Sequence, residues 1–368
     1  MKRIFALLLA LAMVFTLVAC GEKEEAKAEA MAVAMITDYG DITDQSFNQT
    51  TYEACKEYCE ANSLKFNYFK PASDSDDDRV AMIEKAIDEG YNVIVTPGYA
   101  FANALKATAG DNADVKFIAI DVSAGDFGDD YTLPSNLYSA VYQEELCGYM
   151  AGYAAVKLGY TKLGFLGGMA VPAVVRYGYG FVQGADAAAA ETGAAVECNY
   201  AYGNQFFGDA DITAAMDVWY QGGTEVVFAC GGGIFTSAGE AAAKVGGKVI
   251  GVDVDQAPTI DGMYGAGMTV TSAMKGLAPT TKTQLANVKD GKFAGGKIET
   301  LGLVSDTPAD NYVQIPASTQ YSDSFTADDY AALVKAMRAG TVTVSNDVTK
   351  AAADFATVIT VNDQGNIK

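Results

Sequence analysis

Residues 31–48, MAVAMITDYGDITDQSFN, decide the fold that the sequence predicts. The apolar run 33–36 has the length and composition of a buried strand, and it ends in an acidic, glycine-containing loop that leads into a helix. In an open α/β sheet, ligands bind just outside the carboxyl ends of the strands, which is where this loop falls. Phe47 can stack on a ring, Asn48 can donate and accept hydrogen bonds, and the carboxylates can accept from hydroxyls. This set of side chains suits a neutral, planar, hydroxylated ligand.

The same loop has a purely structural explanation. Thr43 or Asp44 can cap the following helix, Phe47 can be the first core contact of that helix, and Asn48 can be solvated. Composition does not separate the two explanations, so the rest of the chain has to.

Apolar strands alternate with helix-length segments along most of the chain. A first cycle has predicted strands at 31–37, 64–70, 92–96 and 115–120, with helices over 44–62, 76–89 and 99–109. A second cycle starts with a helix over 141–158 and has strands at 162–166, 195–202, 225–230 and 247–252, with helices over 173–191, 209–221 and 236–245. This order predicts parallel, doubly wound sheets with right-handed crossovers. Two such lobes facing across a cleft can close on a ligand by a hinge motion.

The last hundred residues contain more elements than either lobe needs. Strand-like runs lie at 268–273, 298–304 and 312–316, and helices are predicted over 276–291 and 327–338. We therefore expect discontinuous lobes: residues 31–137 plus about 272–305 form the N-terminal lobe, and residues 138–271 plus about 306–368 form the C-terminal lobe. The predicted fold class is α/β, with two doubly wound parallel-sheet lobes joined by a hinge.

Polar and glycine residues follow the predicted strands directly. Asp38, Gly98 and Asp121 end strands of the first cycle and should face one crevice. Glycines 231–233 and Asp253 take the corresponding places in the second cycle. The glycines lack the Gly-Lys-Ser/Thr ending of a phosphate-binding loop, so we expect them to allow a turn or the close approach of a neutral ligand.

Charge and composition exclude several classes of function. The formal net charge is −21, which opposes binding to nucleic acids or to an anionic membrane surface. There is no histidine, which removes Ser-His and Cys-His nucleophile pairs and nearly all catalytic zinc sites. The acidic run 74–78 lacks the spacing of a calcium loop and is better explained as helix capping. Cys55 and Cys59 lie one helical turn apart, but buried thiols explain them better than a metal or redox site. No cofactor and no metal are expected.

The N-terminus has the features of a bacterial lipoprotein signal. Lys2 and Arg3 precede a short apolar stretch from 4 to 18, and small residues lead to Cys20. We expect residues 1–20 to be a signal peptide with a lipobox, with Cys20 becoming the lipidated first residue. Residues 21–30 have no apolar periodicity and are expected to be a solvated tether.

Taken together, these segments resemble the basic membrane protein family. The residues that carry the resemblance are TDYGDITDQSFNQ (37–49), GYNVIVTPGYAF (90–101), FIAID (117–121), YQEELCGYMAGYAA (142–155), KLGFLGG (162–168), GYGFVQGA (178–185), FACGGG (228–233), IGVDVDQ (250–256) and TSAMK (271–275). Members of this family are substrate-binding lipoproteins of ABC transporters, and the better-understood ones are purine nucleoside receptors.

The resemblance implies a set of ligand-binding residues. They are Asp38 at the first strand end, the stacking Phe47, the base-reading Asn48, Asp121, backbone groups at Gly231, the ribose-binding carboxylate Asp253, and Lys275. The second aromatic of the base sandwich is left open, with Phe206, Phe207 and Phe235 as candidates; Phe235, just after the glycines, is carried in the predicted site.

The resemblance also implies a function. The chain is expected to be an extracytoplasmic receptor, anchored to the cell membrane by lipid, that captures a nucleoside and delivers it to an ABC permease and its ATPase. It is expected not to be an enzyme and to have no nucleic-acid partner. Two alternatives stay open: a sugar or autoinducer receptor of similar architecture, and a nucleoside hydrolase that uses a carboxylate pair such as Asp38 and Asp121.

Overall fold

The computed structural model describes residues 30–38, 40–128 and 130–368, and within the compact unit Ala32–Lys368 these residues form two sheets. The predicted signal peptide and Cys20 lie outside the described residues, as does the predicted tether except for Ala30. None of the helices in the described part of the chain is both long and apolar enough to cross a membrane.

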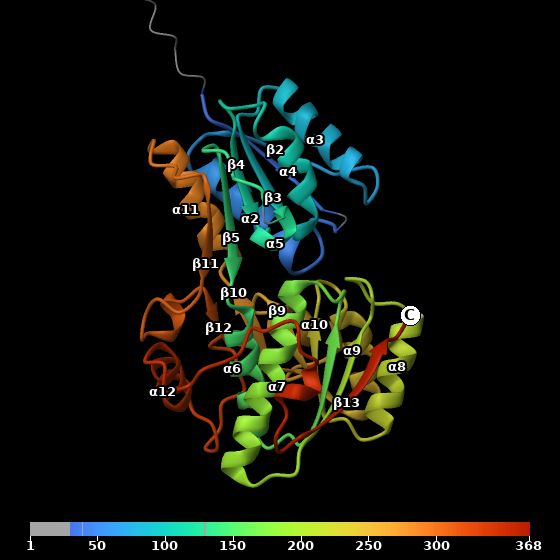
Figure 1. Cartoon of the computed structure of the whole chain (residues 1–368). Coiled ribbons are helices and arrows are strands. Elements are labelled where there is room, and N and C mark those ends of the chain that lie inside the picture. The colour runs from blue at the N-terminus through green and yellow to red at the C-terminus, as the bar shows by residue number, and fades with distance from the viewer. Residues whose placement is uncertain (1–29, 39, 129) are drawn as a thin grey trace, which may run out of the picture. The chain divides into compact units, whose positions relative to one another are not determined.

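The first sheet is parallel throughout and has the strand order β11-β5-β4-β3-β1-β2. Its strands are β1 (Ala32–Ile36), β2 (Lys65–Phe69), β3 (Val93–Pro97), β4 (Lys116–Ile120), β5 (Leu137–Tyr142) and β11 (Lys297–Leu301). Its helices are α2 (Phe47–Ala61), α3 (Asp76–Asp88), η1 (Tyr99–Phe101), α4 (Ala102–Thr108), α5 (Ala124–Phe127) and α11 (Leu277–Lys289) (Figure 1). We call this sheet with its helices the first lobe.

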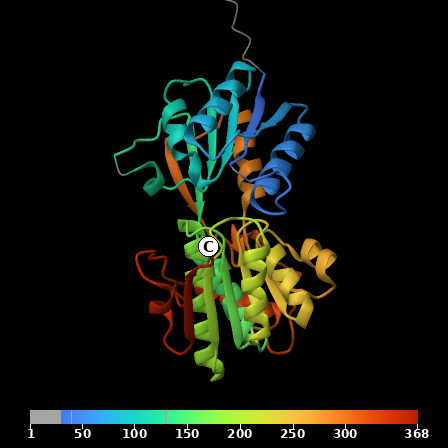
Figure 2. The same ribbon diagram turned by 90° about the vertical axis from the view of Figure 1, so that its right-hand side faces the viewer.

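The second sheet has the order β12-β10-β9-β8-β6-β7-β13 and is parallel except for β12. Its strands are β6 (Lys162–Gly167), β7 (Glu197–Tyr202), β8 (Val226–Cys230), β9 (Lys248–Asp253), β10 (Thr269–Lys275), β12 (Val313–Gln314) and β13 (Thr360–Asn366), the last drawn in red beside β7 in Figure 2. The helices of this second lobe are α6 (Glu144–Lys157), α7 (Pro172–Thr192), α8 (Ala210–Gln221), α9 (Phe235–Val245), α10 (Ala257–Tyr264) and α12 (Ala327–Arg338), with short turns η2 (Pro308–Asp310) and η3 (Ala352–Phe355).

The two lobes repeat one strand order. The series β5-β4-β3-β1-β2 in the first sheet corresponds to β10-β9-β8-β6-β7 in the second. Asp121 follows β4 and Asp253 ends β9, so the two aspartates occupy equivalent places, and both have left-handed backbone conformations with φ of 62° and 65°. Because ligands bind at the carboxyl ends of such strands, each lobe offers the same carboxylate at the same place.

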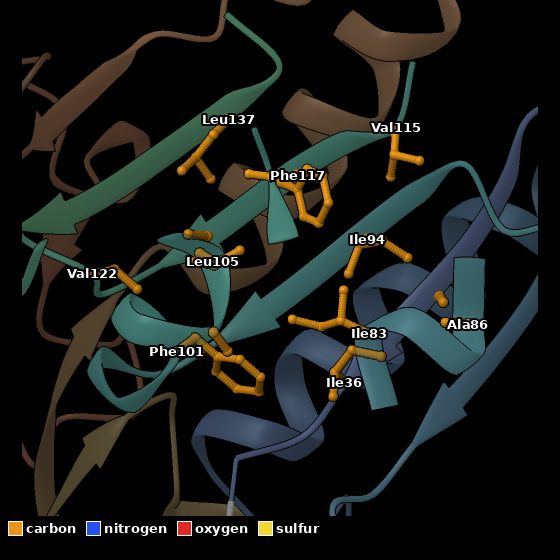
Figure 3. Close-up of a cluster of buried hydrophobic side chains, with 14 of the residues drawn as sticks. Ile36, Ile83, Ala86, Ile94, Phe101, Leu105, Val115, Phe117, Val122 and Leu137 are labelled. Atoms are coloured by element: carbon orange, nitrogen blue, oxygen red, sulfur yellow. The ribbon is translucent and has the colours of Figure 1, made fainter. Parts of the chain in front are cut away.

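Apolar side chains from strands and helices fill the first lobe between its layers. Ile36, Ile94 and Phe117 point from neighbouring strands toward Ile83 of α3 and Leu105 of α4 (Figure 3). All five side chains are fully buried. This packing makes the sheet a rigid base for the loops at its carboxyl ends.

Helices α6 and α7 of the second lobe pack backbone against backbone. A Cβ atom on Gly148 or Gly152 of α6 would overlap a carbonyl oxygen of α7, and one on Gly180 or Gly184 of α7 would overlap a carbonyl oxygen of α6. The spacing of four residues in each helix puts both pairs of glycines on the contact face. This close approach brings the first turns of the two helices together.

The predicted α/β class with two doubly wound lobes is confirmed, whereas two strands were not predicted. Strand β5 runs directly into α6, so the apolar pattern of residues 137–142 merges with that of the helix. Strand β13 is polar and mostly exposed, so it shows no apolar alternation. Strands β5 and β10 run across the predicted crossing points at 138 and 272. The lobe boundaries stay a prediction.

Candidate functional site

A cavity of about 710 Å³ lies where the carboxyl ends of the two sets of strands meet. The first lobe lines it with the loops after β1, β3 and β4, and the second lobe with those after β6, β7, β8 and β9. All eight residues of the predicted ligand site line this one cavity: Asp38, Phe47, Asn48, Asp121, Gly231, Phe235, Asp253 and Lys275. The volume is within the range of small-molecule pockets.

Asp44 builds the loop that precedes α2. Its carboxylate accepts the backbone N–H groups of Ser46 at 2.9 Å, Asn48 at 2.9 Å and Gln49 at 3.1 Å, and also the side-chain amide of Asn48 at 3.1 Å. Burial raises the pKa of Asp44, and these hydrogen bonds offset part of the rise. Asp44 therefore accepts N–H groups at the start of α2, but the N-cap that the structural explanation of this loop predicted at Thr43 or Asp44 is wrong, because the N-cap residue of α2 is Ser46. The solvated Asn48 of that explanation is wrong, because the residue is 3% exposed and lines the cavity.

Asp38 is a carboxylate in a confined place. Its Oδ1 accepts the backbone N–H of Gly40 at 2.5 Å. A Cβ on Gly98 would lie 3.0 Å from the other carboxylate oxygen, so the residue after β3 has to be small. Burial is the main cause that raises the pKa of Asp38 to about 6. Among the described residues no cation pairs with it at salt-bridge distance, which leaves an acceptor at the cavity wall.

Lys275 joins carboxylates from both lobes. Its ammonium forms an ion pair with Asp121 and lies 3.6 Å from Asp253 Oδ1 and 3.7 Å from Glu144 Oε1. Burial alone lowers the pKa of Lys275, but these three carboxylates outweigh burial and hold the pKa well above its ordinary value. The ammonium also lies 4.7 Å from the centre of the Phe47 ring. One buried cation thus connects the aromatic surface with the two strand-end aspartates.

Glu144 and Arg176 support this cluster and were not predicted. Arg176 Nε donates to Glu144 Oε2 at 2.7 Å, and the Glu144 side chain is 0% exposed. The two residues meet because α6 and α7 pack backbone against backbone. The only sequence signal was the repeated glycine spacing at 148/152 and 180/184, which indicates a close helix pair but not the charges that it brings together.

Three phenylalanines were candidates for the second aromatic wall. Phe235 is 1% exposed and belongs to the core of the second lobe, although it also lines the cavity. Phe207 is 61% exposed. Phe206 lies against two glycines, since a Cβ on Gly168 would overlap its ring and one on Gly231 would lie 3.0 Å from it. The glycine at 231 therefore makes room for an aromatic ring.

Negative charge dominates the cavity lining. Of the described residues that line it, seven are aspartates, and the two cations, Arg176 and Lys275, are both paired with carboxylates. No group of three potential metal ligands occurs in the described part of the chain. The cysteines from Cys55 to Cys230 are free and buried, which agrees with the thiol explanation favoured from the sequence. Such a lining opposes anionic ligands and favours ligands that present hydrogen-bond donor groups.

A family model described as "ABC transporter substrate-binding protein PnrA-like" matches residues 31–331. The chain belongs to this family. It is 31% identical over 327 residues to the "ABC transporter nucleoside-binding protein BmpA" of Lactococcus lactis subsp. cremoris, covering 82% of this chain and 89% of the relative. It is 30% identical to "Basic membrane protein D" of Borreliella burgdorferi, covering 81% of this chain and 86% of the relative.

Solved structures support the fold of this PnrA-like protein. A solute-binding protein of an ABC transporter system from Conexibacter woesei has a TM-score of 0.65 and 22% identity, over 86% of this chain and 99% of the other. A solute-binding protein from Aeropyrum pernix has a TM-score of 0.64 and 20% identity, over 88% and 90% of the two chains. The predicted resemblance to the basic membrane protein family is confirmed. The protein is an extracytoplasmic substrate-binding protein of an ABC transporter, with a small molecule as its ligand.

Proposed function

We propose that the protein captures nucleosides, with a purine base as the preferred class, and delivers them to its transporter. The observation that carries this proposal is the position of Phe47 beside the Lys275 cluster. An aromatic face and two carboxylates, Asp121 and Asp253, lie around one ammonium group, at separations of 3.6 Å or less for the carboxylates and 4.7 Å for the ring. A nucleoside has the matching parts, a flat base joined directly to a hydroxylated sugar.

The base is placed on Phe47, with Phe206 as the opposite wall. Phe47 comes from the first lobe and Phe206 from the second, so closure of the lobes would enclose a flat ring between them. Stacking of a base on an aromatic side chain contributes about 1–3 kcal/mol. Phe206 replaces Phe235 in this role because the Phe235 ring is packed in the core. Asp38 and Asn48 would contact the edge of the base.

The sugar is placed at the two strand-end aspartates. A ribose diol can donate both hydroxyl hydrogens to carboxylate oxygens, and charge-assisted hydrogen bonds of this kind are the stronger ones. The ammonium of Lys275 neutralises part of the buried negative charge, which allows the site to exclude water. The negative lining disfavours phosphorylated ligands. The description of the Lactococcus relative as a nucleoside-binding protein supports the same assignment.

The remaining parts of the proposal concern delivery. Cys20 would carry the lipid that anchors the protein to the cell membrane, and the partners are the permease and ATPase of the transporter. The protein would bind and release its ligand without making or breaking covalent bonds.

Thermal melting against a ligand panel tests the proposal. Purified protein, freed of bound ligand by unfolding and refolding, is melted with guanosine, inosine, adenosine, uridine, ribose and free bases. A ligand at a thousandfold over its Kd stabilises by about 4 kcal/mol, which shifts the melting temperature by several degrees. The shift with purine nucleosides should disappear in Phe47→Ala. It should persist in Tyr68→Ala, which removes a surface aromatic of the same lobe outside the cavity.

Two other outcomes would contradict the proposal. A shift with ribose or another sugar and none with nucleosides would favour a sugar receptor and remove the stacking argument. Release of free base from inosine during incubation would show a nucleoside hydrolase, and chromatography of the incubated mixture detects it.

A further inference from the structure

Two consecutive residues of the loop before α2 bond the first lobe to the second. Ser46 Oγ donates to Asp253 Oδ2 at 2.6 Å. The backbone carbonyl of Gln45 accepts from Gln256 Nε2 at 3.0 Å, and the side-chain oxygen of Gln45 accepts from Thr259 Oγ1 at 3.2 Å. All three bonds run from the loop after β1 to the last residue of β9 or to the segment that follows it.

The loop is held in the shape that makes these bonds. Gln45 has a left-handed backbone with φ of 58°, which a residue with a side chain adopts only when its surroundings require it. The backbone N–H of Gln45 donates to Gln49 Oε1 at 3.0 Å, and Asp44 accepts the N–H of Ser46. Asp44, together with Gln49 of α2, therefore holds Gln45 and Ser46 in place from within the first lobe.

The residues of the second lobe that take part in these bonds are equally fixed. Gln256 is 1% exposed, its Oε1 accepts the N–H of Val252 at 2.9 Å, and its own N–H donates to Ser272 Oγ at 3.2 Å. The other oxygen of Asp253 faces Tyr177 at 3.4 Å and Lys275 at 3.6 Å. The Asp253 carboxylate is thus held from the first lobe on one oxygen and from the second lobe on the other.

These hydrogen bonds join the two lobes directly, without a ligand between them. Of the described residues, Asp253 and Gln45 line the cavity, whereas Ser46, Gln256 and Thr259 do not. We infer that Gln45 and Ser46 are positioning residues for ligand binding: they orient the Asp253 carboxylate and hold the lobes together, so that bound ligand leaves slowly. The inference rests on the substrate-binding role of the family, and it uses the proposed function only in the choice of probe.

The first test is the dissociation rate of inosine, measured by stopped-flow with the purified protein. Ser46→Ala removes one hydrogen bond to a charged group and should speed dissociation about tenfold, with the association rate nearly unchanged. Thr259→Val should speed dissociation by about threefold, and Ser46→Thr should restore the wild-type rate. Ser318→Ala is the matched control, because Ser318 Oγ also donates to a carboxylate, that of Asp255 at 2.8 Å, but within the second lobe.

A rate in Ser46→Ala equal to that of the wild type overturns the inference, as does an equal change in Ser318→Ala. A purely structural role would lower the melting temperature of the protein without changing the dissociation rate.

The second test needs no ligand, so it separates this inference from the proposed function. Small-angle X-ray scattering measures the radius of gyration of ligand-free protein. The double variant with Ser46→Ala and Thr259→Val should have a larger radius than the wild type, because fewer bonds hold the lobes together. An unchanged radius overturns the inference, whatever the ligand of the site proves to be.

Discussion

Replacing Asp38 by Asn should stabilise the protein at neutral pH. The substitution keeps the shape of the side chain and an oxygen for the Gly40 N–H, but it removes a charge that burial disfavours. Burial raises the pKa of Asp38 to about 6. Because one pKa unit corresponds to 1.36 kcal/mol, a rise from about 3.9 costs the folded state about 3 kcal/mol when the group is ionised. Since the carboxyl is partly open to the cavity, we expect Asp38→Asn to gain about 1–3 kcal/mol at pH 7.5.

The gain should depend on pH with a fixed sign. Asp38 is ionised in the folded protein above about pH 6, so the full cost is present there. As the pH falls below this value, Asp38 takes up a proton in the folded protein. The cost of its buried charge then decreases, until at the pKa of the unfolded chain little of it is left. The gain of Asp38→Asn should therefore fall to about half at pH 5 and vanish near pH 3.

Urea unfolding followed by circular dichroism at pH 7.5 and pH 5 measures both quantities. The control is Asp41→Asn, three residues away, where an exposed carboxylate pairs with Lys70 and the hydrogen bond from that lysine lowers the pKa of Asp41. That variant should be unchanged or slightly less stable. Burial of the Asp38 charge does not destabilise the folded protein if Asp38→Asn is less stable than the wild type at pH 7.5, or if its gain is the same at both pH values.

Three further substitutions test other parts of the structure. Lys275→Met leaves buried carboxylates without their cation and should lower the free energy of unfolding, measured in urea at pH 7.5, by about 3–5 kcal/mol. The loss should be smaller at pH 5, because burial raises the pKa of Glu144 and more of this carboxyl is protonated there. A variant as stable as the wild type would contradict the role given to this cluster. Asp186→Asn should lower the free energy of unfolding by about 1–3 kcal/mol and speed hydrogen exchange at residues 357–359, whose N–H groups donate hydrogen bonds to this carboxylate. Unchanged exchange at these residues would contradict this prediction. Gly152→Ala should cost at least about 2 kcal/mol, because its Cβ overlaps the Phe181 carbonyl, whereas Gly262→Ala, with open space around its Cβ, should not lower the melting temperature.

Much of the fold followed from local pattern. Buried parallel strands are short apolar runs, and the residues after them fall at one edge of the sheet, so Asp38, Asp121 and Asp253 could be placed together from the sequence. Strand β13 could not be predicted, because its residues have no apolar alternation and only the pairing with β7 makes them a strand.

The site was harder to predict where it depends on tertiary contacts. Phe206 and Phe235 both follow strands of the second lobe, and only packing shows that one ring is in the core and the other rests on glycines. Glu144 and Arg176 are 32 residues apart in sequence and on different helices. A charge pair of this kind has no local signal. The inter-lobe bonds of Gln45 and Ser46 span more than 200 residues and likewise have none.

The glycine contact between α6 and α7 has a mechanical consequence. Interfaces made of side chains can yield by changing rotamers, whereas here carbonyl oxygens meet bare backbone and there is nothing to rearrange. The two helices should therefore move as one stiff block that carries Glu144 and Arg176 with it. Any bending during ligand capture then has to occur elsewhere, and Gly276 and Gly302, in segments where the chain passes from one sheet to the other, are the natural places for it.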